Sequence, residues 1–288
     1  DNVYFYGPAE MAMFMGTQGE NPTVETPEGD FQLPSLIVNN HILFLNKKVS
    51  SSGAVKPPMA RDLLNYYTSE QLRAHFLSLG LGLKSVSVQP KPLNPGAQEK
   101  DADPVLKEGN LLSNVFNRAA RSCFYAAQKY YEGKIPVGEI SREVLDESRK
   151  VILEYEKFMY RAEFHQVMSL MDNYIRNINK YWAKNIRQSE QDNDVTLRTK
   201  TLVDTFHMVR TAAVLMHPVA PKGTEMILEY LNLGNDFWNW ERIFQTVYDF
   251  MPDPVNHKLK FLEPRIDFFE KHPSQIAAEF KKDGESRE

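Results

Sequence analysis

The sequence contains a single cysteine among its 288 residues, Cys123, so no disulfide can form within the chain and a cysteine-based zinc cluster is excluded. No apolar run is long enough to span a bilayer, and no segment has the pattern of a signal peptide. The seven histidines show no metal-ligand spacing. We therefore expect a cytoplasmic protein with no membrane partner and no metal site of its own.

A strong net charge is also lacking. The 34 Lys and Arg residues stand against 38 Asp and Glu residues, which gives a formal net charge of −4. A nucleic-acid partner would therefore have to be met by a local basic patch, because the field of the whole chain does not attract phosphate. The length is enough for one large or two ordinary domains with real cores. The chain starts without a Met and enters residues 3–6, Val-Tyr-Phe-Tyr, which predict a strand and a beginning inside a domain.

A loop rich in lysine and serine occupies residues 45–53, Leu-Asn-Lys-Lys-Val-Ser-Ser-Ser-Gly. It follows strand-like residues at 36–38 and 41–44 and precedes a helix signal at Pro57-Pro58. Lysine ammonium groups pair with phosphate oxygens, Ser hydroxyls and free backbone N–H groups add donors, and Gly53 allows a tight turn. The pattern thus favours a phosphate-binding loop, although most loops of this composition are only solvated connections.

The middle of the chain predicts two helices and then a linker. The helices cover residues 59–67 and 69–79, with Thr68 or Ser69 as a cap and Gly80 as the stop. Residues 84–104 read as a linker because they carry Pro90, Pro92, Pro95, Gly96 and Pro104. We place a domain boundary near residue 100.

The remainder predicts long amphipathic helices joined by short links, which is typical of an antiparallel helical bundle. The expected helices cover residues 106–132, 139–160, 162–184, 194–216 and 221–231. In the first of them Cys123 belongs to the apolar stripe, so it is predicted to be a buried structural thiol. Trp238 and Trp240 are expected to pack the end of the bundle, without a role in a site.

One face of the helix at 106–132 differs from an ordinary solvated face. Asn117 and Arg121 are four residues apart and are expected to project together, away from the apolar stripe, and no acid lies between Asn110 and Tyr131. Amides and guanidinium groups hydrogen-bond unpaired base edges and phosphates, so the face suits single-stranded RNA. A merely polar face is the alternative. Trp182, near the predicted end of the helix at 162–184, is open to two interpretations: stacking on a splayed-out base, or burial in the bundle.

Several motifs together resemble methionyl-tRNA synthetases. Residues 48–52, Lys-Val-Ser-Ser-Ser, resemble the Lys-Met-Ser-Lys-Ser loop of class I aminoacyl-tRNA synthetases, and residues 67–73, Tyr-Thr-Ser-Glu-Gln-Leu-Arg, are similar to that family's Tyr-Gly-Ala-Asp-Ala-Leu-Arg. Residues 218–225 resemble its Pro-Val-Leu-Pro-x-x-Thr-Glu run. Residues 261–267 resemble its Leu-Phe-Pro-Arg-Ile-Asp ending.

The resemblance implies a mainly α fold: a truncated α/β remnant of a class I catalytic domain over residues 1–100, followed by an anticodon-binding helical bundle over residues 101–288. It implies a methionine–tRNA ligase that uses ATP and Mg²⁺, with methionine and the anticodon loop of tRNA(Met) as partners and no DNA. The phosphates would meet Lys47, Lys48, Ser50, Ser51 and Ser52. By the same resemblance, the anticodon would be recognised by Asn117, Arg121 and Trp182.

Four departures from the family pattern leave an alternative open. The chain has Pro8-Ala9, Met13-Phe14 and Asn39-Asn40 where the family has other residues near the amino-acid pocket, and Ser51 replaces the second lysine of the loop. The chain also has no His-x-Gly-His element, which the family uses as the other half of its ATP site. We therefore expect this chain to be inactive alone. A degenerate paralogue that binds tRNA or a protein without charging is the alternative, and a helical scaffold without an RNA role is a third.

Overall fold

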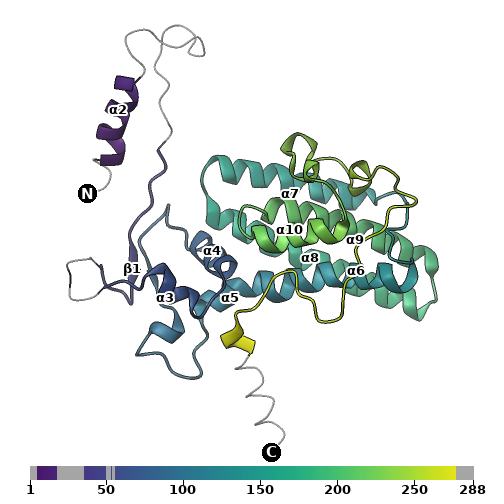
Figure 1. Cartoon of the computed structure of the whole chain (residues 1–288), viewed down its shortest axis with the longest axis horizontal. Helices are drawn as coiled ribbons and strands as arrows, with labels where there is room; N and C mark the ends of the chain where they lie inside the picture. Colours follow the sequence, from purple (N-terminus) through teal and green to yellow (C-terminus); the bar gives the residue numbers. More distant parts are fainter. Residues whose placement is uncertain (1–4, 18–35, 50–52, 54–55, 277–288) are drawn as a thin grey trace, which may run out of the picture.

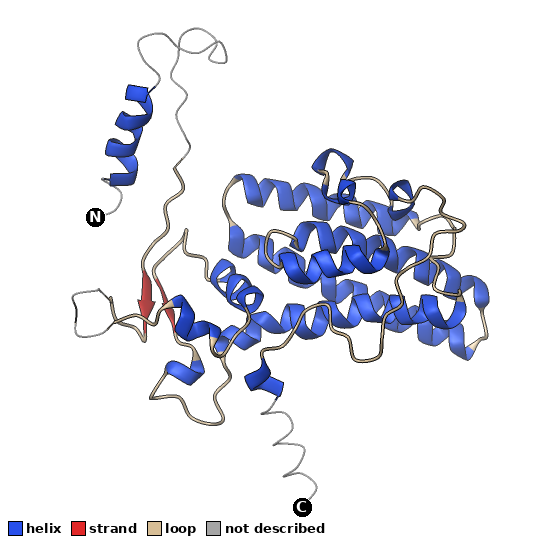
Figure 2. Cartoon of the chain, in the orientation of Figure 1, coloured by secondary structure: helices blue, strands red, loops and turns tan. Residues whose placement is uncertain are grey.

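The computed structural model describes residues 5–17, 36–49, 53 and 56–276. It is mainly helical, with one small two-stranded sheet, and most helices gather into a single bundle (Figure 1, Figure 2). No helix in the described part of the chain is long and apolar enough to cross a membrane. The coarse prediction of a mainly α protein is confirmed.

The first described segment is helical, not extended. A π-helical turn, η1 (Phe5–Ala9), leads into α2 (Glu10–Thr17), so the prediction of a strand at residues 3–6 is wrong for Phe5 and Tyr6, and residues 3 and 4 lie outside the described residues. A cluster of methionines such as Met11, Met13 and Met15 predicts core filling more readily than a pocket lining. In α2, however, Met13 and Met15 are exposed, at 64 % and 42 %, so they do not fill a core.

The sheet pairs one strand with a second strand that lies inside the predicted linker. β1 (Ile42–Phe44) runs parallel to β2 (Val86–Val88), with Phe44 opposite Val88. Residues 36–38 are not in a strand. β2 and the 3₁₀ turn η3 (Lys91–Leu93) lie inside the predicted linker, so that segment is partly ordered by pairing with β1.

A short helical hairpin follows the lysine–serine loop. α3 (Ala60–Leu64) is shorter than predicted, and α4 (Ser69–Ser78) begins at the Thr68 cap, whose hydroxyl accepts the Gln71 N–H. Gly80 has a φ of +67°, a conformation that glycine adopts without strain, and it follows the end of α4 as predicted. A small core of Leu63, Tyr67, Leu72 and Val105 joins this hairpin to the next helix. Because that core draws on both sides of residue 100, the domain boundary there stays a prediction.

The next helix is continuous from residue 104 to 130 but contains a π-helical stretch. It consists of α5 (Pro104–Asn110), η4 (Leu111–Phe116) and α6 (Asn117–Tyr130). Gly133, with a φ of +75°, lies just beyond its end. The predicted apolar stripe is confirmed at its centre: Cys123 is fully buried, and burial raises the pKa of its thiol well above the ordinary range.

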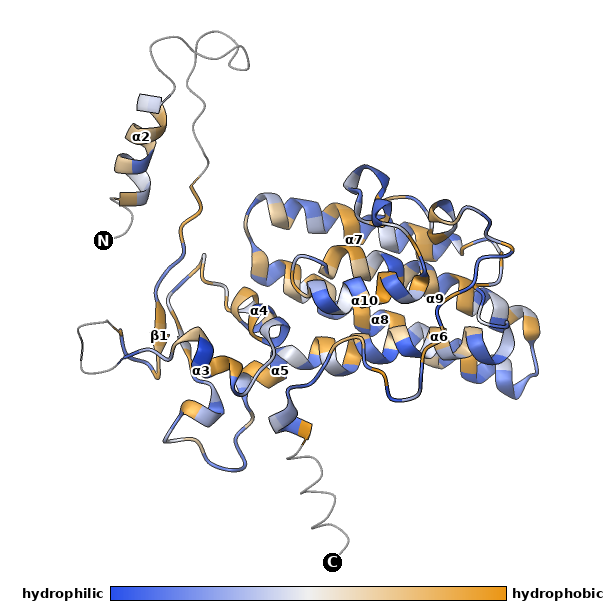
Figure 3. Ribbon diagram, in the orientation of Figure 1, coloured by the Kyte–Doolittle hydropathy of each residue, from blue (hydrophilic) through white to orange (hydrophobic). Residues whose placement is uncertain are grey.

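The bundle continues with α7 (Arg142–Tyr160), α8 (Phe164–Gln191), α9 (Val195–Met216) and α10 (Pro221–Leu231). α9 is the central helix: all residues from Thr201 to Met216 are buried. Helices α6, α7 and α8 instead mix hydrophilic and hydrophobic residues along their length, as expected of helices with one buried side (Figure 3). α8 ends seven residues later than the predicted stop at Lys184, because no glycine or proline interrupts residues 185–191.

After α10 the chain forms three 3₁₀ turns, η5 (Asn235–Trp238), η6 (Trp240–Arg242) and η7 (Val247–Phe250), and then a tail. The tail lies along the bundle and continues to the α3–α4 hairpin (Figure 1). The Leu259 N–H donates to the Gly133 carbonyl at 2.9 Å, and Gln275 Nε2 donates to the Tyr66 carbonyl at 3.2 Å. The tail thus ties the bundle to the hairpin.

Candidate nucleic-acid interface and lysine loop

The lysine–serine loop leaves β1 through a tight reverse turn. Leu45 and Asn46 both have positive φ, at 48° and 64°, and the Phe44 N–H and Lys47 N–H each donate to the other residue's carbonyl at 3.0 Å. Two successive positive-φ residues between bonded partners are typical of the two-residue hairpin turn that matches strand twist. The turn delivers Lys47 and Lys48 to the surface, where both side chains are exposed.

The second strand supports this turn. Ser87 Oγ accepts the Asn46 N–H at 2.7 Å, and Gln89 Nε2 donates to Asn46 Oδ1 at 3.2 Å. Ser87 and Gln89 were missed in the sequence because a three-residue strand among prolines has no measurable periodicity. Ser50, Ser51 and Ser52 lie outside the described residues, so their predicted contact with phosphate stays a prediction.

Asn117 does not lie away from the buried stripe. Its side chain is only 3 % exposed, its Nδ2 donates to the Ser113 carbonyl at 3.2 Å, and its Oδ1 accepts the Phe268 N–H at 2.8 Å. The outward orientation predicted for Asn117 is therefore wrong. The amide satisfies a backbone N–H of the tail, which would otherwise be buried without a partner.

Arg121 does share a face with Asn117, and the tail covers that face too. Its Nη1 lies 2.6 Å from Asp267 Oδ1. Further along α6, Gln128 Oε1 accepts the Leu262 N–H at 3.0 Å and Gln128 Nε2 donates to the Leu262 carbonyl at 3.3 Å. We call this set, Asn117, Arg121 and Gln128 against residues 262–268, the tail clamp.

Trp182 lies in the interior of α8, since the helix runs to Gln191, so the expectation that it sits in the last turn is wrong. Its side chain is partly buried and packs against the bundle core. The neighbouring Tyr181 hydroxyl donates to Asp204 Oδ2 on α9. Both interpretations of the tryptophan therefore keep a physical basis: part of the indole is packed, and part reaches solvent.

α6 and α8 lie side by side and run in the same direction. Asn179 Nδ2 donates to the Val115 carbonyl at 2.8 Å, and further along both helices the Tyr130 hydroxyl donates to Glu190 Oε1 at 3.2 Å. Trp182 and Arg118 follow Asn179 and Val115 by three residues each, so they lie at the same level on neighbouring helices.

The exposed side of α8 carries a basic stripe that extends beyond Lys180 and Lys184, the two lysines that flank Trp182 in the sequence. It consists of Arg176, Lys180, Lys184 and Arg187, spaced four, four and three residues apart and all exposed. No acid lies between Asp172 and Glu190, just as none lies between Asn110 and Tyr131 on α6. The spacing of these four cations was the signal that could have revealed the stripe. These adjacent acid-free stretches give a local excess of positive charge that the net charge of the chain does not supply, although Arg176 is paired with Asp172 and Arg121 with Asp267.

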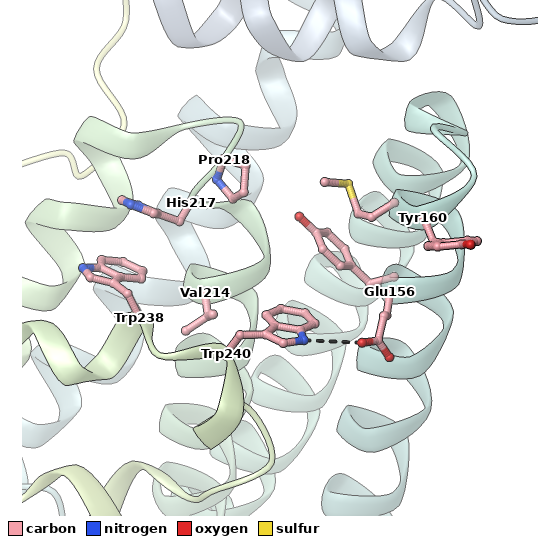
Figure 4. Close-up of a pocket in the computed structure, with 9 residues that line it drawn as sticks. Glu156, Tyr160, Val214, His217, Pro218, Trp238 and Trp240 are labelled. Carbon is pink, nitrogen blue, oxygen red and sulfur yellow. Dashed lines mark hydrogen bonds between the residues drawn. The ribbon is translucent and has the colours of Figure 1, made fainter. Parts of the chain in front are cut away.

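The end of the bundle contains an apolar pocket of about 430 Å³ between the ends of α7 and α9 and the turns η5 and η6 (Figure 4). Trp238 stacks on His217 with ring centres 3.9 Å apart, and burial lowers the pKa of that histidine. Trp240 is 40 % exposed and points its Nε1 at Glu156 Oε1, 3.5 Å away. The expected packing role holds for Trp238, which contacts the core, whereas Trp240 lines the open pocket.

Nothing in the described residues brings three or more metal-binding side chains together. Mg²⁺ in nucleotide sites is coordinated mostly by phosphates and water. This observation therefore concerns only metal sites whose ligands are all protein side chains. Lys47 and Lys48, exposed beside each other, fit the phosphates of ATP in charge and access.

In fold, the chain is similar to class I aminoacyl-tRNA synthetases. No protein-family model matches it. The solved relatives are methionyl-tRNA synthetases: the Mycobacterium tuberculosis enzyme bound by methionyl-adenylate has a TM-score of 0.59 and 19 % sequence identity, over 80 % of this chain and 43 % of that one. The free form of the same enzyme gives a TM-score of 0.56 at 18 % identity, over 73 % of this chain and 40 % of that one.

Curated relatives carry the corresponding name. Methionine–tRNA ligase 1 of Alkaliphilus oremlandii is 24 % identical over 217 residues, which is 72 % of this chain and 36 % of that protein. Methionine–tRNA ligase of Bacillus cereus is 20 % identical over 249 residues, or 86 % of this chain and 42 % of that protein. The resemblance to methionyl-tRNA synthetases is thus confirmed over most of the chain, which spans about two fifths of the length of these relatives.

Proposed function

We propose that the chain is the C-terminal part of a methionine–tRNA ligase and that its bundle binds the anticodon end of tRNA(Met). The supporting observation is the pair of adjacent acid-free stretches, residues 111–130 on η4 and α6 and residues 173–189 on α8, with the partly exposed Trp182 on the second of them. Phosphates would meet the basic stripe of α8, and an unstacked base would meet the exposed part of the indole. An anticodon is a single-stranded loop, the form of RNA that proteins read by stacking and edge contacts.

In the parent enzyme, the exposed Lys47 and Lys48 would hold ATP phosphates, together with Ser50, Ser51 and Ser52. ATP with Mg²⁺ supplies the activated phosphate for methionyl-adenylate formation; this chain supplies charge and hydrogen-bond donors to it. The chain alone lacks a His-x-Gly-His element, so we expect no adenylate synthesis from it. Methionine-dependent pyrophosphate exchange by the isolated chain would contradict that expectation.

The tail clamp favours a second candidate. Asn117 and Arg121, which the resemblance assigns to base recognition, are bonded to the Phe268 N–H and to Asp267. A base could reach the buried Asn117 only after the tail moves, and it would compete with Asp267 for Arg121. A paralogue that binds tRNA or a protein without charging anything is compatible with a permanently closed clamp, and so with loss of anticodon discrimination.

The test is a titration of the 288-residue chain with an RNA hairpin carrying the anticodon CAU and with a scrambled-loop hairpin, at two salt concentrations. The proposal expects tighter binding of CAU and an affinity that falls steeply with salt. Equal binding of both hairpins favours the non-charging paralogue. Binding of neither rejects the RNA role of the bundle.

A further inference from the structure

A second pocket lies on the other side of the bundle from α6, between α7 and the segment that joins η6 to η7. Its volume is about 280 Å³. Its polar lining comes from Arg142, Arg149, Ser148, Thr246 and His207, and its apolar lining from Leu145, Ile152, Ile243 and Phe244. Asp146, the only acid in the lining, lies 3.8 Å from Arg142 Nε, so Arg149 leaves the lining net positive.

His207 reaches this pocket from the central helix α9. It is 3 % exposed, and its Nδ1 has no hydrogen-bond partner. Burial, and to a lesser extent the nearby Arg210, lowers the pKa of the imidazole to about 4, so the ring is neutral at pH 7. A buried nitrogen without a partner costs on the order of 1–3 kcal/mol, which a ligand that pairs with it would recover.

Arg210 lies one helical turn further along α9 and bonds to the backbone of Ile243, a residue that lines the pocket. It is fully buried, with Nη1 2.5 Å from the Ile243 carbonyl and Nη2 3.2 Å from the Arg242 carbonyl. Its Nε has no partner, and none of the ion pairs in the described part of the chain includes it. Carbonyl oxygens satisfy N–H groups but do not neutralise a charge, so this guanidinium is buried without a counterion.

Asp249 interacts electrostatically with Arg210, but the two side chains form no ion pair. Asp249 acts on both His207 and Arg210 through space, but its Oδ2 accepts the Thr246 N–H at 2.6 Å and the Thr246 hydroxyl at 2.7 Å. The like-charged Arg242 also faces Arg210. The groups around the pocket therefore leave an excess of positive charge next to an unpaired buried nitrogen.

We propose that this pocket binds a small phosphate ester whose organic part is apolar. The guanidinium fork of Arg149 at the rim matches the oxygens of a phosphate, and Arg142 adds a second cation beside Asp146. The Thr246 and Ser148 hydroxyls are engaged with Asp249 and Tyr174, so the unpartnered His207 Nδ1 is the inner polar group left for a ligand. Leu145, Ile152, Ile243 and Phe244 give the organic part an apolar wall. The volume exceeds what a bare phosphate needs, since one water takes about 30 Å³ of liquid volume.

The test uses the 288-residue chain and four probes: phenyl phosphate, inorganic phosphate, phenol and benzoate. We expect calorimetric binding of phenyl phosphate, weaker binding of inorganic phosphate and none of phenol, together with a shift of the His207 ring signals in NMR. Binding of phenol as tight as that of phenyl phosphate would overturn the proposal, since the site would then be only apolar. Equal binding of benzoate would overturn the assignment to phosphate.

Two variants with the same charge change provide the control. Arg149→Gln removes a cation that lines the pocket, and Lys150→Gln removes an exposed cation one residue away that does not line it. We expect Arg149→Gln to weaken phenyl phosphate binding about tenfold and Lys150→Gln less than twofold. An equal loss in both variants would mean that only the general field attracts the anion. Both residues are exposed, so circular dichroism should report an unchanged fold.

Discussion

Arg121 on α6 and Asp267 in the tail form an ion pair, Nη1 to Oδ1 at 2.6 Å, across 146 residues of sequence. Each side chain is about one third exposed, so the pair contributes less than about 1 kcal/mol to stability. Its larger effect is on access, because Asp267 competes with a base edge for the Arg121 guanidinium.

Asp267→Asn should therefore raise affinity for the CAU hairpin several-fold if Arg121 contacts RNA, since the freed guanidinium then has a stronger partner in RNA than in an amide. Glu263→Gln is the matched control, because it removes the same charge from an exposed tail position. Equal gains in both variants would show that only the net charge of the tail matters. Fluorescence titration of labelled hairpins measures both.

Trp182 can be separated into its packing and stacking roles by two substitutions. Loss of a base stack costs about 1–3 kcal/mol, so Trp182→Ala should weaken hairpin binding roughly five- to hundred-fold. Trp182→Phe keeps an aromatic plane and most of the packing, and should lose much less. If Trp182→Ala unfolds the bundle in circular dichroism and Trp182→Phe binds as the wild type does, the residue is part of the core and its site role is withdrawn.

The basic stripe should raise the affinity for RNA hairpins without changing the preference for the CAU loop. Lys184→Ala should weaken CAU and scrambled hairpins alike and reduce the slope of log affinity against log salt by about one, because phosphate contacts release counterions. Lys157→Ala, an exposed lysine on α7, is the control and should change neither quantity. A loss confined to the CAU hairpin would instead assign Lys184 a contact with a base edge.

The loop prediction concerns Ser51 in the full-length parent. If the missing second lysine limits adenylation, Ser51→Lys should raise the rate of pyrophosphate exchange, since one charge-assisted contact to phosphate contributes about 1.5–3 kcal/mol. The Ser51→Ala variant removes the hydroxyl without adding a charge, so it shows whether the hydroxyl itself contributes to the rate. An unchanged rate in the lysine variant would mean that Lys47 or Lys56 already fills the role, or that the loop is not catalytic.

His207 should make stability pH-dependent. Its folded pKa is about 4 and its unfolded value about 6.5. The unfolded chain therefore binds the proton first, so stability falls as pH drops from 6.5 towards 4 and is fully present above 6.5. The loss reaches about 3 kcal/mol at most, at about 1.4 kcal/mol per pKa unit. His207→Gln should flatten this part of the curve in urea denaturation at pH 7, 5.5 and 4.5; parallel curves would contradict the assignment.

Features with a local physical cause were predictable from the sequence. α10 begins and ends at the predicted Pro221 and Leu231, because a proline starts it and Asn232, in the left-handed conformation, ends it. The buried stripe around Cys123 followed from its 3.6-residue period. The Thr68 cap followed from a hydroxyl placed before a helical pattern.

Features set by distant segments were not predictable in the same way. Asn117 looks like a surface amide on its own helix, and only the Phe268 N–H, 151 residues later, makes it an interior group. β2 could be recognised as a strand only from its pairing with β1, because three residues are too few to show a hydrophobic periodicity. Only part of the candidate RNA face could therefore be predicted. The acid-free stretch of α6 is apparent in the sequence, but the tail segment that covers Asn117 and Arg121 is not.

Gly223 allows the close approach that keeps the tail in place: a Cβ there would lie 2.1 Å from a ring carbon of Phe269. The ring of Phe269 also stacks on Phe116, with centres 4.9 Å apart. During synthesis, α6 leaves the ribosome about 150 residues before the phenylalanines that cover it, and domains form as their residues emerge. The nascent bundle therefore presents Asn117 and Arg121 uncovered until residues 262–269 have been synthesised and close over them.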